Sequence, residues 1–93
     1  MEEEKIQTVT SKGKKGVRID KKKYDLVKKT ILEHFKKGVE IPFKELRRSV
    51  EQKLEGRFKG SATWYFMSVK LDLEGRGIIE RVPGKKLQLL RLK

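Results

Sequence analysis

Apolar residues recur at helical spacing along residues 20–37, with basic residues on the other sides. Four of them define one face: Tyr24, Val27, Ile31 and Phe35. This spacing predicts an amphipathic helix with one buried face. Asp20 is a favourable N-cap residue, and Gly38 can supply the left-handed residue that ends a helix. The helix is therefore predicted to run from Asp20 to about Lys37.

A short strand and a second helix are predicted next. Val39-Glu40-Ile41 lies between a helix stop and a proline and is rich in β-branched residues, which predicts one brief strand. Pro42 suits the first turn of a helix, and Glu45 is well placed against the helix dipole. The buried side of this helix is marked by Phe43, Leu46, Val50 and Leu54. The pattern breaks over residues 55–60, which predicts a loop.

The third predicted helix carries two apolar stripes on opposite sides. Ser61 is expected to cap it, and it should run to about Arg76, before Gly77. One stripe holds Ala62, Phe66, Val69 and Leu73, and the other holds Trp64, Met67 and Leu71. Polar residues fill the gaps, with Thr63, Lys70 and Glu74 in one gap and Ser68 and Asp72 in the other. Such a helix either packs on two sides or presents one stripe to a partner.

The C-terminal residues predict a β-hairpin. Residues 78–82 indicate a strand, Pro83-Gly84 favours a type II turn, and residues 87–92 indicate the returning strand. Leu87 and Leu89 are out of phase with the leucines that follow them. The returning strand is therefore expected to carry a bulge or to be buried on both faces.

The N-terminal segment has few apolar residues and much charge. Residues 1–16 are therefore predicted to form a disordered charged tail, with the folded domain over residues 17–93. The charge is divided, because Glu2 to Glu4 are acidic, whereas Lys12 to Lys23 holds seven basic residues and one acid.

The overall charge sets the first expectation about partners. The formal net charge is +12 and the calculated pI is about 10.1. A basic surface attracts nucleic acid first, then acidic protein patches and anionic lipid. The absence of cysteine excludes disulfides, thiolate catalysis and the usual structural zinc sites. No apolar run could span a membrane and the N-terminus does not resemble a signal peptide, so a cytoplasmic protein with no membrane partner is expected.

The order of elements predicts an α+β fold, and specifically a winged helix. In that fold the short strand pairs with the C-terminal hairpin, which forms the wing, and three helices cover one face of the small antiparallel sheet. An all-helical fold would require the C-terminal residues to be helical. Pro83-Gly84 argues against that alternative.

Several strings near the C-terminus point to a known group of proteins. They are Trp64-Tyr65, Val69-Lys70-Leu71-Asp72-Leu73-Glu74, Arg76-Gly77 and Ile79-Glu80-Arg81-Val82-Pro83-Gly84. Through them, residues 17–93 resemble a family of small uncharacterised bacterial winged-helix-like proteins. The part from Leu73 to Arg81 is also similar to the end of the recognition helix and the first wing strand of many bacterial transcription regulators. Because that family has no established activity, the resemblance implies architecture and leaves function to the residues.

Nucleic-acid binding is the predicted function, with duplex DNA as the expected partner and RNA as the alternative. In a winged helix the third helix commonly enters the major groove and the wing touches the backbone. The candidate contact residues are Arg57, Lys59, Ser61, Thr63, Lys70, Lys85, Lys86, Lys12, Lys14, Lys15 and Arg18. Largely electrostatic contacts of this kind would suit a transcription regulator or a chromatin-associated factor.

A protein-interaction module, monomeric or homodimeric, is the competing hypothesis. In it the stripe of Trp64, Met67 and Leu71 meets another protein or a second copy, since aromatic and Met side chains suit interface cores. A third interpretation is that the rest of the domain buries this stripe entirely.

No enzyme active site, cofactor or metal site is predicted. His34 is the only histidine, and it has no second candidate ligand beside it. Asp72 and Glu74 point to different sides of the third helix, whereas Asp72 and Arg76 are spaced to pair at the surface. Gly13-Lys14-Lys15-Gly16 lacks the spacing and the strand context of a phosphate-binding loop.

Overall fold

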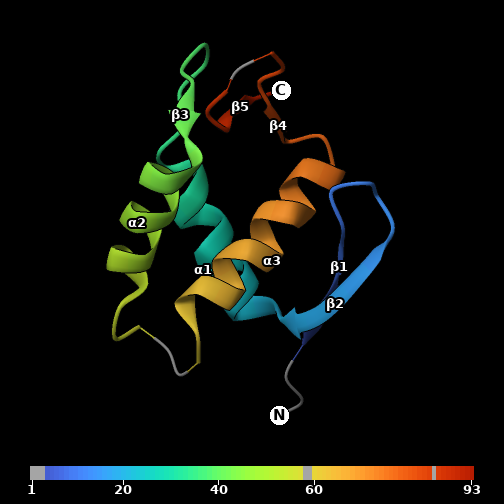
Figure 1. Cartoon of the computed structure of the whole chain (residues 1–93). Coiled ribbons are helices and arrows are strands. Elements are labelled where there is room, and N and C mark those ends of the chain that lie inside the picture. Colours follow the sequence, from blue (N-terminus) through green and yellow to red (C-terminus); the bar gives the residue numbers. More distant parts are fainter. Residues whose placement is uncertain (1–3, 58–59, 85) are drawn as a thin grey trace.

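The computed structural model describes residues 4–57, 60–84 and 86–93. Over these residues the chain forms three helices and two small antiparallel sheets (Figure 1). The strands are β1 (Lys5–Val9), β2 (Lys15–Asp20), β3 (Ile41–Pro42), β4 (Ile79–Arg81) and β5 (Leu89–Leu92), and the helices are α1 (Lys21–Leu32), α2 (Phe43–Leu54) and α3 (Ala62–Gly75). The predicted α+β class is therefore confirmed.

Helix α1 begins where predicted but ends early. The Asp20 side chain accepts a hydrogen bond at 3.2 Å from the backbone N–H three residues further on, which confirms Asp20 as the N-cap. The helix ends at Leu32 rather than at Lys37, and Gly38 lies in the loop that follows. The cause is a change to tighter turns, because the Phe35 N–H donates to the carbonyl three residues back. This turn carries the Phe35 ring into the core.

Helices α2 and α3 begin and end close to their predicted positions. Helix α2 starts directly after Pro42. Its buried residues are Leu46, Val50 and Leu54. The Ser61 side chain caps α3 by accepting a hydrogen bond at 3.1 Å from the Trp64 backbone N–H. After α3, Gly77 has a φ of 76°, which is the left-handed residue expected there.

The three-stranded sheet has the order β3-β5-β4, and both pairs are antiparallel. Ile41 pairs with Leu90, so the short strand does pair with the hairpin, although β3 covers residues 41–42 rather than 39–41. The returning strand starts at Leu89, which leaves Leu87 69 % exposed outside it and Leu90 fully buried. Leu87 therefore lies outside the strand, whereas the half-buried Leu89 still stands next to the buried Leu90 within it.

The N-terminal segment forms a hairpin in the structure. Where the sequence predicts a disordered tail over residues 1–16, β1 pairs with β2 and Ile6 lies opposite Ile19. Thr8 is buried, and its hydroxyl donates to the Val17 carbonyl at 2.6 Å. Ile19 belongs to the core and Ile6 packs against it. These alternating inward positions give the hairpin its buried face; residues 1–3 lie outside the described part of the chain.

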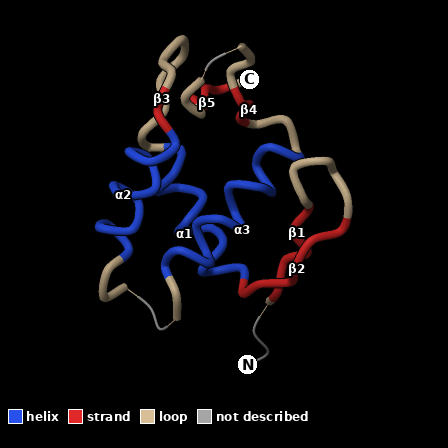
Figure 2. Tube along the Cα trace, in the orientation of Figure 1, coloured by secondary structure: helices blue, strands red, loops and turns tan. Residues whose placement is uncertain are grey.

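The core lies among the three helices and reaches both sheets. Its fully buried residues include Val27, Ile31, Val50, Phe66, Val69, Leu73 and Leu90. Figure 2 shows the three-stranded sheet at one end of the helices and the β1–β2 hairpin beside α3. Helix α3 packs on α1, α2, β1 and β4. It is therefore the element that links the two sheets.

Candidate nucleic-acid interface

Five basic side chains project from the β1–β2 hairpin. They are Lys5, Lys12, Lys14, Lys15 and Arg18, and all of them are exposed. The stretch from Lys5 to Ile19 contains no acidic residue. Within the described chain, none of the five forms an ion pair with a carboxylate. The hairpin therefore carries a strip of positive charge, and its one acid within β1 and β2 is Asp20, which lies opposite Lys5.

The strand register explains why these side chains point outward. Lys5 and Arg18 alternate with Ile6 and Ile19, whose side chains face the core, so they share the outer face of the hairpin. Arg18 belongs to the set predicted from the sequence. Lys5 does not, because its place on this face depends on a strand that the sequence analysis did not assign.

Backbone hydrogen bonds hold the tip of the hairpin. The Thr10 N–H donates to the Lys14 carbonyl at 2.7 Å, and the Gly13 N–H donates to the Thr10 carbonyl at 2.8 Å. The Lys14 N–H also donates to the Thr10 hydroxyl at 3.2 Å. Lys12, Lys14 and Lys15 therefore project from a closed, hydrogen-bonded turn.

Helix α3 holds the hairpin through the buried carboxylate of Asp72. Its Oδ1 accepts a hydrogen bond from the Val9 backbone N–H at 2.8 Å, and Arg76 Nε donates to both of its oxygens at 2.9 Å. The Tyr24 hydroxyl of α1 donates to Oδ2. Arg76 also donates through Nη2 to the Gln7 carbonyl at 3.1 Å. One carboxylate therefore joins α1, α3 and β1.

The burial of this group is a correction to the sequence analysis. The sequence predicts that Asp72 and Arg76 pair at the surface; they do pair, but the Asp72 side chain is fully buried. Burial, together with the hydrogen bond to Asp72, raises the pKa of Tyr24 well above its ordinary value of about 10. The hydrogen bond to Asp72 likewise raises the pKa of Arg76. Both groups therefore keep their protons near neutral pH, and the carboxylate keeps both donors.

A glycine inside α3 allows the hairpin backbone to approach the helix closely. A Cβ atom at Gly75 would lie 2.1 Å from the Thr10 carbonyl oxygen and 2.8 Å from Val9 Cγ2. A larger residue would not fit there unless the hairpin moved, although glycine within a helix costs about 1 kcal/mol relative to alanine. This close approach seats the hairpin on the C-terminal half of α3.

The other predicted contact residues are divided between the two ends of α3. Arg57, Ser61 and Thr63 lie at or before its start, whereas Lys86 lies between β4 and β5, beyond its end. Because α3 has 14 residues, the two groups are separated by about 20 Å along the helix axis. Lys59 and Lys85 lie outside the described residues.

Two hydroxyl groups at the start of α3 are already engaged. Ser61 Oγ accepts the capping hydrogen bond from the Trp64 N–H. The Thr63 hydroxyl donates to Glu51 Oε1 at 2.6 Å. The Thr63 proton is therefore committed to Glu51, whereas the capping bond uses Ser61 only as an acceptor.

Lys70 does not lie where a groove contact requires it. The sequence places it on a polar side of the third helix, but only 4 % of the residue is exposed. Its Nζ lies 2.6 Å from Glu74 Oε1 and 4.8 Å from the ring centroid of Phe43. Because Phe43 of α2 covers that side of the helix, Lys70 is a core ion-pair partner and cannot reach a base.

The second apolar stripe of α3 is only partly covered. Trp64 is 45 % exposed, and Met67 and Leu71 are half-buried. The rings of Trp64 and Tyr65 meet edge to face, with centroids 4.9 Å apart. Lys70 is the only basic residue between Ala62 and Gly75. The outer side of α3 therefore presents apolar side chains and no cation of its own.

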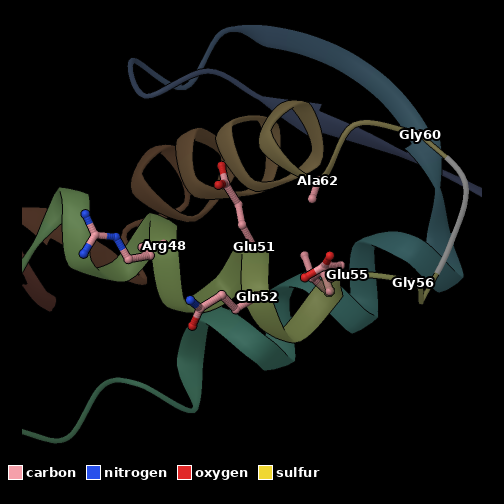
Figure 3. Close-up of a pocket in the computed structure, with 8 residues that line it drawn as sticks. Arg48, Glu51, Gln52, Glu55, Gly56, Gly60 and Ala62 are labelled. Carbon is pink, nitrogen blue, oxygen red and sulfur yellow. The ribbon is translucent and has the colours of Figure 1, made fainter.

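An open hollow of about 420 Å³ lies between the end of α2 and the start of α3 (Figure 3). Its charged and amide lining residues are Arg48, Glu51, Gln52 and Glu55. The Glu51 carboxylate accepts a hydrogen bond from the Thr63 hydroxyl, and its Oε1 lies 3.8 Å from Arg47 Nε. Among the described residues, no group of three or more His, Cys, Asp or Glu side chains could hold a metal ion. The hollow offers mixed surface charge, so the hairpin is the stronger candidate for a binding surface.

Among the described helices, none has the length and apolar character of a membrane-spanning segment.

Comparison with known proteins identifies the family of the chain. No curated protein and no solved structure is significantly similar to the chain. A family model matches residues 5–89, which include both strands of the N-terminal hairpin and all of α1, α2 and α3. The match starts well before residue 17, so the hairpin lies within the part that the family shares. The chain belongs to a family of unknown function (DUF6958).

Proposed function

We propose that the chain from α1 to β5 is a winged helix to which the β1–β2 hairpin has been added, and that it binds duplex DNA. The support for the fold is the order of the elements and the sheet order β3-β5-β4, in which the strand before α2 pairs with the returning strand of the C-terminal hairpin. Three helices and a wing of this arrangement are common among DNA-binding domains.

The observation that carries the proposed function is the excess of exposed positive charge. The net charge is +12. Among the described residues, the ion pairs involve Lys21, Arg47, Lys53, Lys70, Arg76 and Arg91. Most of the other Lys and Arg side chains face water, where they can displace the cations condensed on a duplex. Binding of this kind would serve a transcription regulator or a chromatin-associated factor.

Equilibrium binding to random-sequence duplex DNA across a salt series tests this function. The logarithm of affinity should fall linearly with the logarithm of salt concentration, with a slope of about 0.9 for each phosphate contacted. A duplex RNA of the same length separates the two nucleic acids, because its groove dimensions differ. Lack of binding at low salt, by a protein with a native circular dichroism spectrum, would exclude the function.

Self-association through α3 is a second candidate, favoured by the exposure of Trp64. A large aromatic ring beside Met67 and Leu71 has the composition of an interface core. The partner would be a second copy of the chain, with the two stripes in contact. Sedimentation equilibrium of the parent protein and of Trp64→Ala tests it. A dimer that is lost on substitution supports this candidate, and a monomer at all concentrations rejects it.

A further inference from the structure

Helix α3 is poorly equipped to be the element that meets nucleic acid. In a winged helix this helix is the usual one to enter the groove. Here its only cation, Lys70, is buried against Glu74. The Thr63 hydroxyl is bound to Glu51, and the exposed Trp64 offers mainly an apolar ring. Contacts with phosphates require positive charge, which α3 does not supply from its own exposed side chains.

We propose that the β1–β2 hairpin, rather than α3, enters the groove of duplex DNA and makes the main phosphate contacts; this inference rests on the proposed DNA-binding function. The major groove of B-DNA admits a two-stranded β-ribbon as well as an α-helix. The hairpin carries five exposed cations, at its tip and on its outer face, and no acid between Lys5 and Ile19. Phosphates line both walls of a groove, so a ribbon of this composition meets them on either side.

The hairpin is already held in place for such a contact. Asp72 binds the Val9 N–H, and Arg76 binds the Gln7 carbonyl. On the irregular stretch between Gln7 and Val9, Gln7 Nε2 donates to the Gly16 carbonyl at 2.8 Å. A docked ribbon loses less conformational entropy on binding than a disordered tail would. The anchors are Asp72 of α3 and its C-cap residue Arg76, so the outer face remains available to a ligand.

The chemistry of the hairpin favours phosphates over bases. Gln7 is the only Asn or Gln between Lys5 and Ile19, and its amide is engaged with backbone carbonyls of Gly16 and Val17. It is therefore not presented for the paired contact with adenine that such amides make. Lysines on phosphates carry little sequence information. The ligand class is accordingly duplex DNA of any sequence.

A pair of matched triple variants tests the inference in the full chain. The hairpin variant combines Lys12→Gln, Lys14→Gln and Lys15→Gln. The control combines Lys36→Gln, Lys37→Gln and Lys44→Gln, which removes the same charge from exposed positions in the α1–β3 loop and on α2. The hairpin variant should bind random duplex DNA roughly tenfold or more weakly at fixed low salt, and its salt slope should fall by about 0.9 per lost contact. The control should change both quantities much less.

A second variant guards against loss of the hairpin fold. Lys5→Gln with Arg18→Gln alters the outer face and leaves the hydrogen bonds of the tip in place, so it should weaken binding in the same direction. Melting temperatures of all variants show whether the domain remains folded. If the outer-face variant binds like the parent while the tip variant has lost its fold, the inference fails.

Trp64 supplies an independent readout of α3. It is the only tryptophan, so its quenching by acrylamide reports on the exposed side of that helix. Saturating DNA should leave this quenching unchanged. Equal losses of affinity in the two triple variants, or shielding of Trp64 by DNA, would overturn the inference while DNA binding itself stands. Parent protein that binds anionic vesicles but no DNA would overturn both.

Discussion

The carboxylate of Asp72 in α3 accepts a hydrogen bond at 2.8 Å from the backbone N–H of Val9 in β1, 63 positions earlier. Tyr24 and Arg76 donate to the same carboxylate. Removing the acid would leave the buried Tyr24 hydroxyl and the Val9 N–H without their acceptor, which costs more than the bonds themselves contribute. One side chain of α3 therefore fixes β1 to both α1 and α3.

Asp72→Ala is expected to lower the free energy of unfolding by about 2–4 kcal/mol, because it removes the acceptor of the buried Tyr24 hydroxyl and of the Val9 N–H. The loss of the pair with Arg76 adds less, because that side chain is 40 % exposed. Urea unfolding measures this loss, and amide exchange shows whether β1 has detached. Glu33→Ala is the matched control, since Glu33 is an exposed acid that lies 3.6 Å from Lys53, and it should lose much less. Amides of β1 that exchange as slowly in Asp72→Ala as in the parent would contradict the expectation.

Gly75→Ala should displace the hairpin although alanine is the better helix former. The added Cβ would lie 2.1 Å from the Thr10 carbonyl oxygen, and neither backbone can yield by a side-chain rotation. We expect faster amide exchange in β1 and β2, with the amides of α1 and α2 less affected. Ser68→Ala, in the same helix, should leave hairpin exchange unchanged. A gain in stability of about 1 kcal/mol, as intrinsic helix propensity alone predicts, would show that the contact is not tight.

Lys70 should behave as a core residue. Lys70→Met keeps the packing against Phe43 but leaves the Glu74 carboxylate without its cation, so the free energy of unfolding should fall by about 3–5 kcal/mol. Adding Glu74→Met should restore most of the loss, because an apolar pair can replace a buried ion pair. Lys44→Met is the exposed control and should change little. Equal effects at Lys70 and Lys44 would show that Lys70 faces water.

The raised pKa of Tyr24 predicts that the protein loses stability at alkaline pH. Its pKa in the folded state is raised above the unfolded value of about 10, so the folded protein holds the phenolic proton more tightly. The contribution is complete below about pH 10 and is lost as pH rises toward the folded-state pKa. The free energy of unfolding, measured with urea, should therefore fall more steeply above pH 10 in the parent than in Tyr24→Phe. Identical pH slopes in the two proteins would refute this assignment.

Features with local causes could be predicted from the sequence. Asp20 and Ser61 cap their helices because the N–H groups that they bind lie three residues further along the chain. The buried face of α1 follows from spacing alone. The early end of that helix could not be predicted. A tighter turn carries Phe35 into the core, and the free energy gained by that turn depends on the side chains that surround Phe35 there.

The N-terminal hairpin depends on residues far along the chain. Ile6 and Thr8 alternate in β1, as do Val17 and Ile19 in β2, and this period of two is the signal that could have indicated the strands. They are anchored by Asp72 and packed against the core, and no local window contains these partners. Four of the candidate contact residues are brought together for that reason.

The burial of Lys70 in α3 likewise could not be predicted from the sequence near it. Its place beside Phe66 and Leu73 in the helical projection is compatible with burial, and Glu74 stands at the spacing of an ion pair. Whether that side is covered depends on Phe43 of another helix. Spacing along one element could not decide this.

The position of β5 has a consequence for protein synthesis. This strand is the central one of its sheet, and its Leu90 is fully buried, so the sheet cannot form before residues 89–92 exist. Translation delivers the N-terminal residues first. The β1–β2 hairpin emerges early yet must wait for α3. The nascent chain should therefore emerge from the ribosome with its helices unpacked, and reach its final form only after the last strand, β5, has been synthesised.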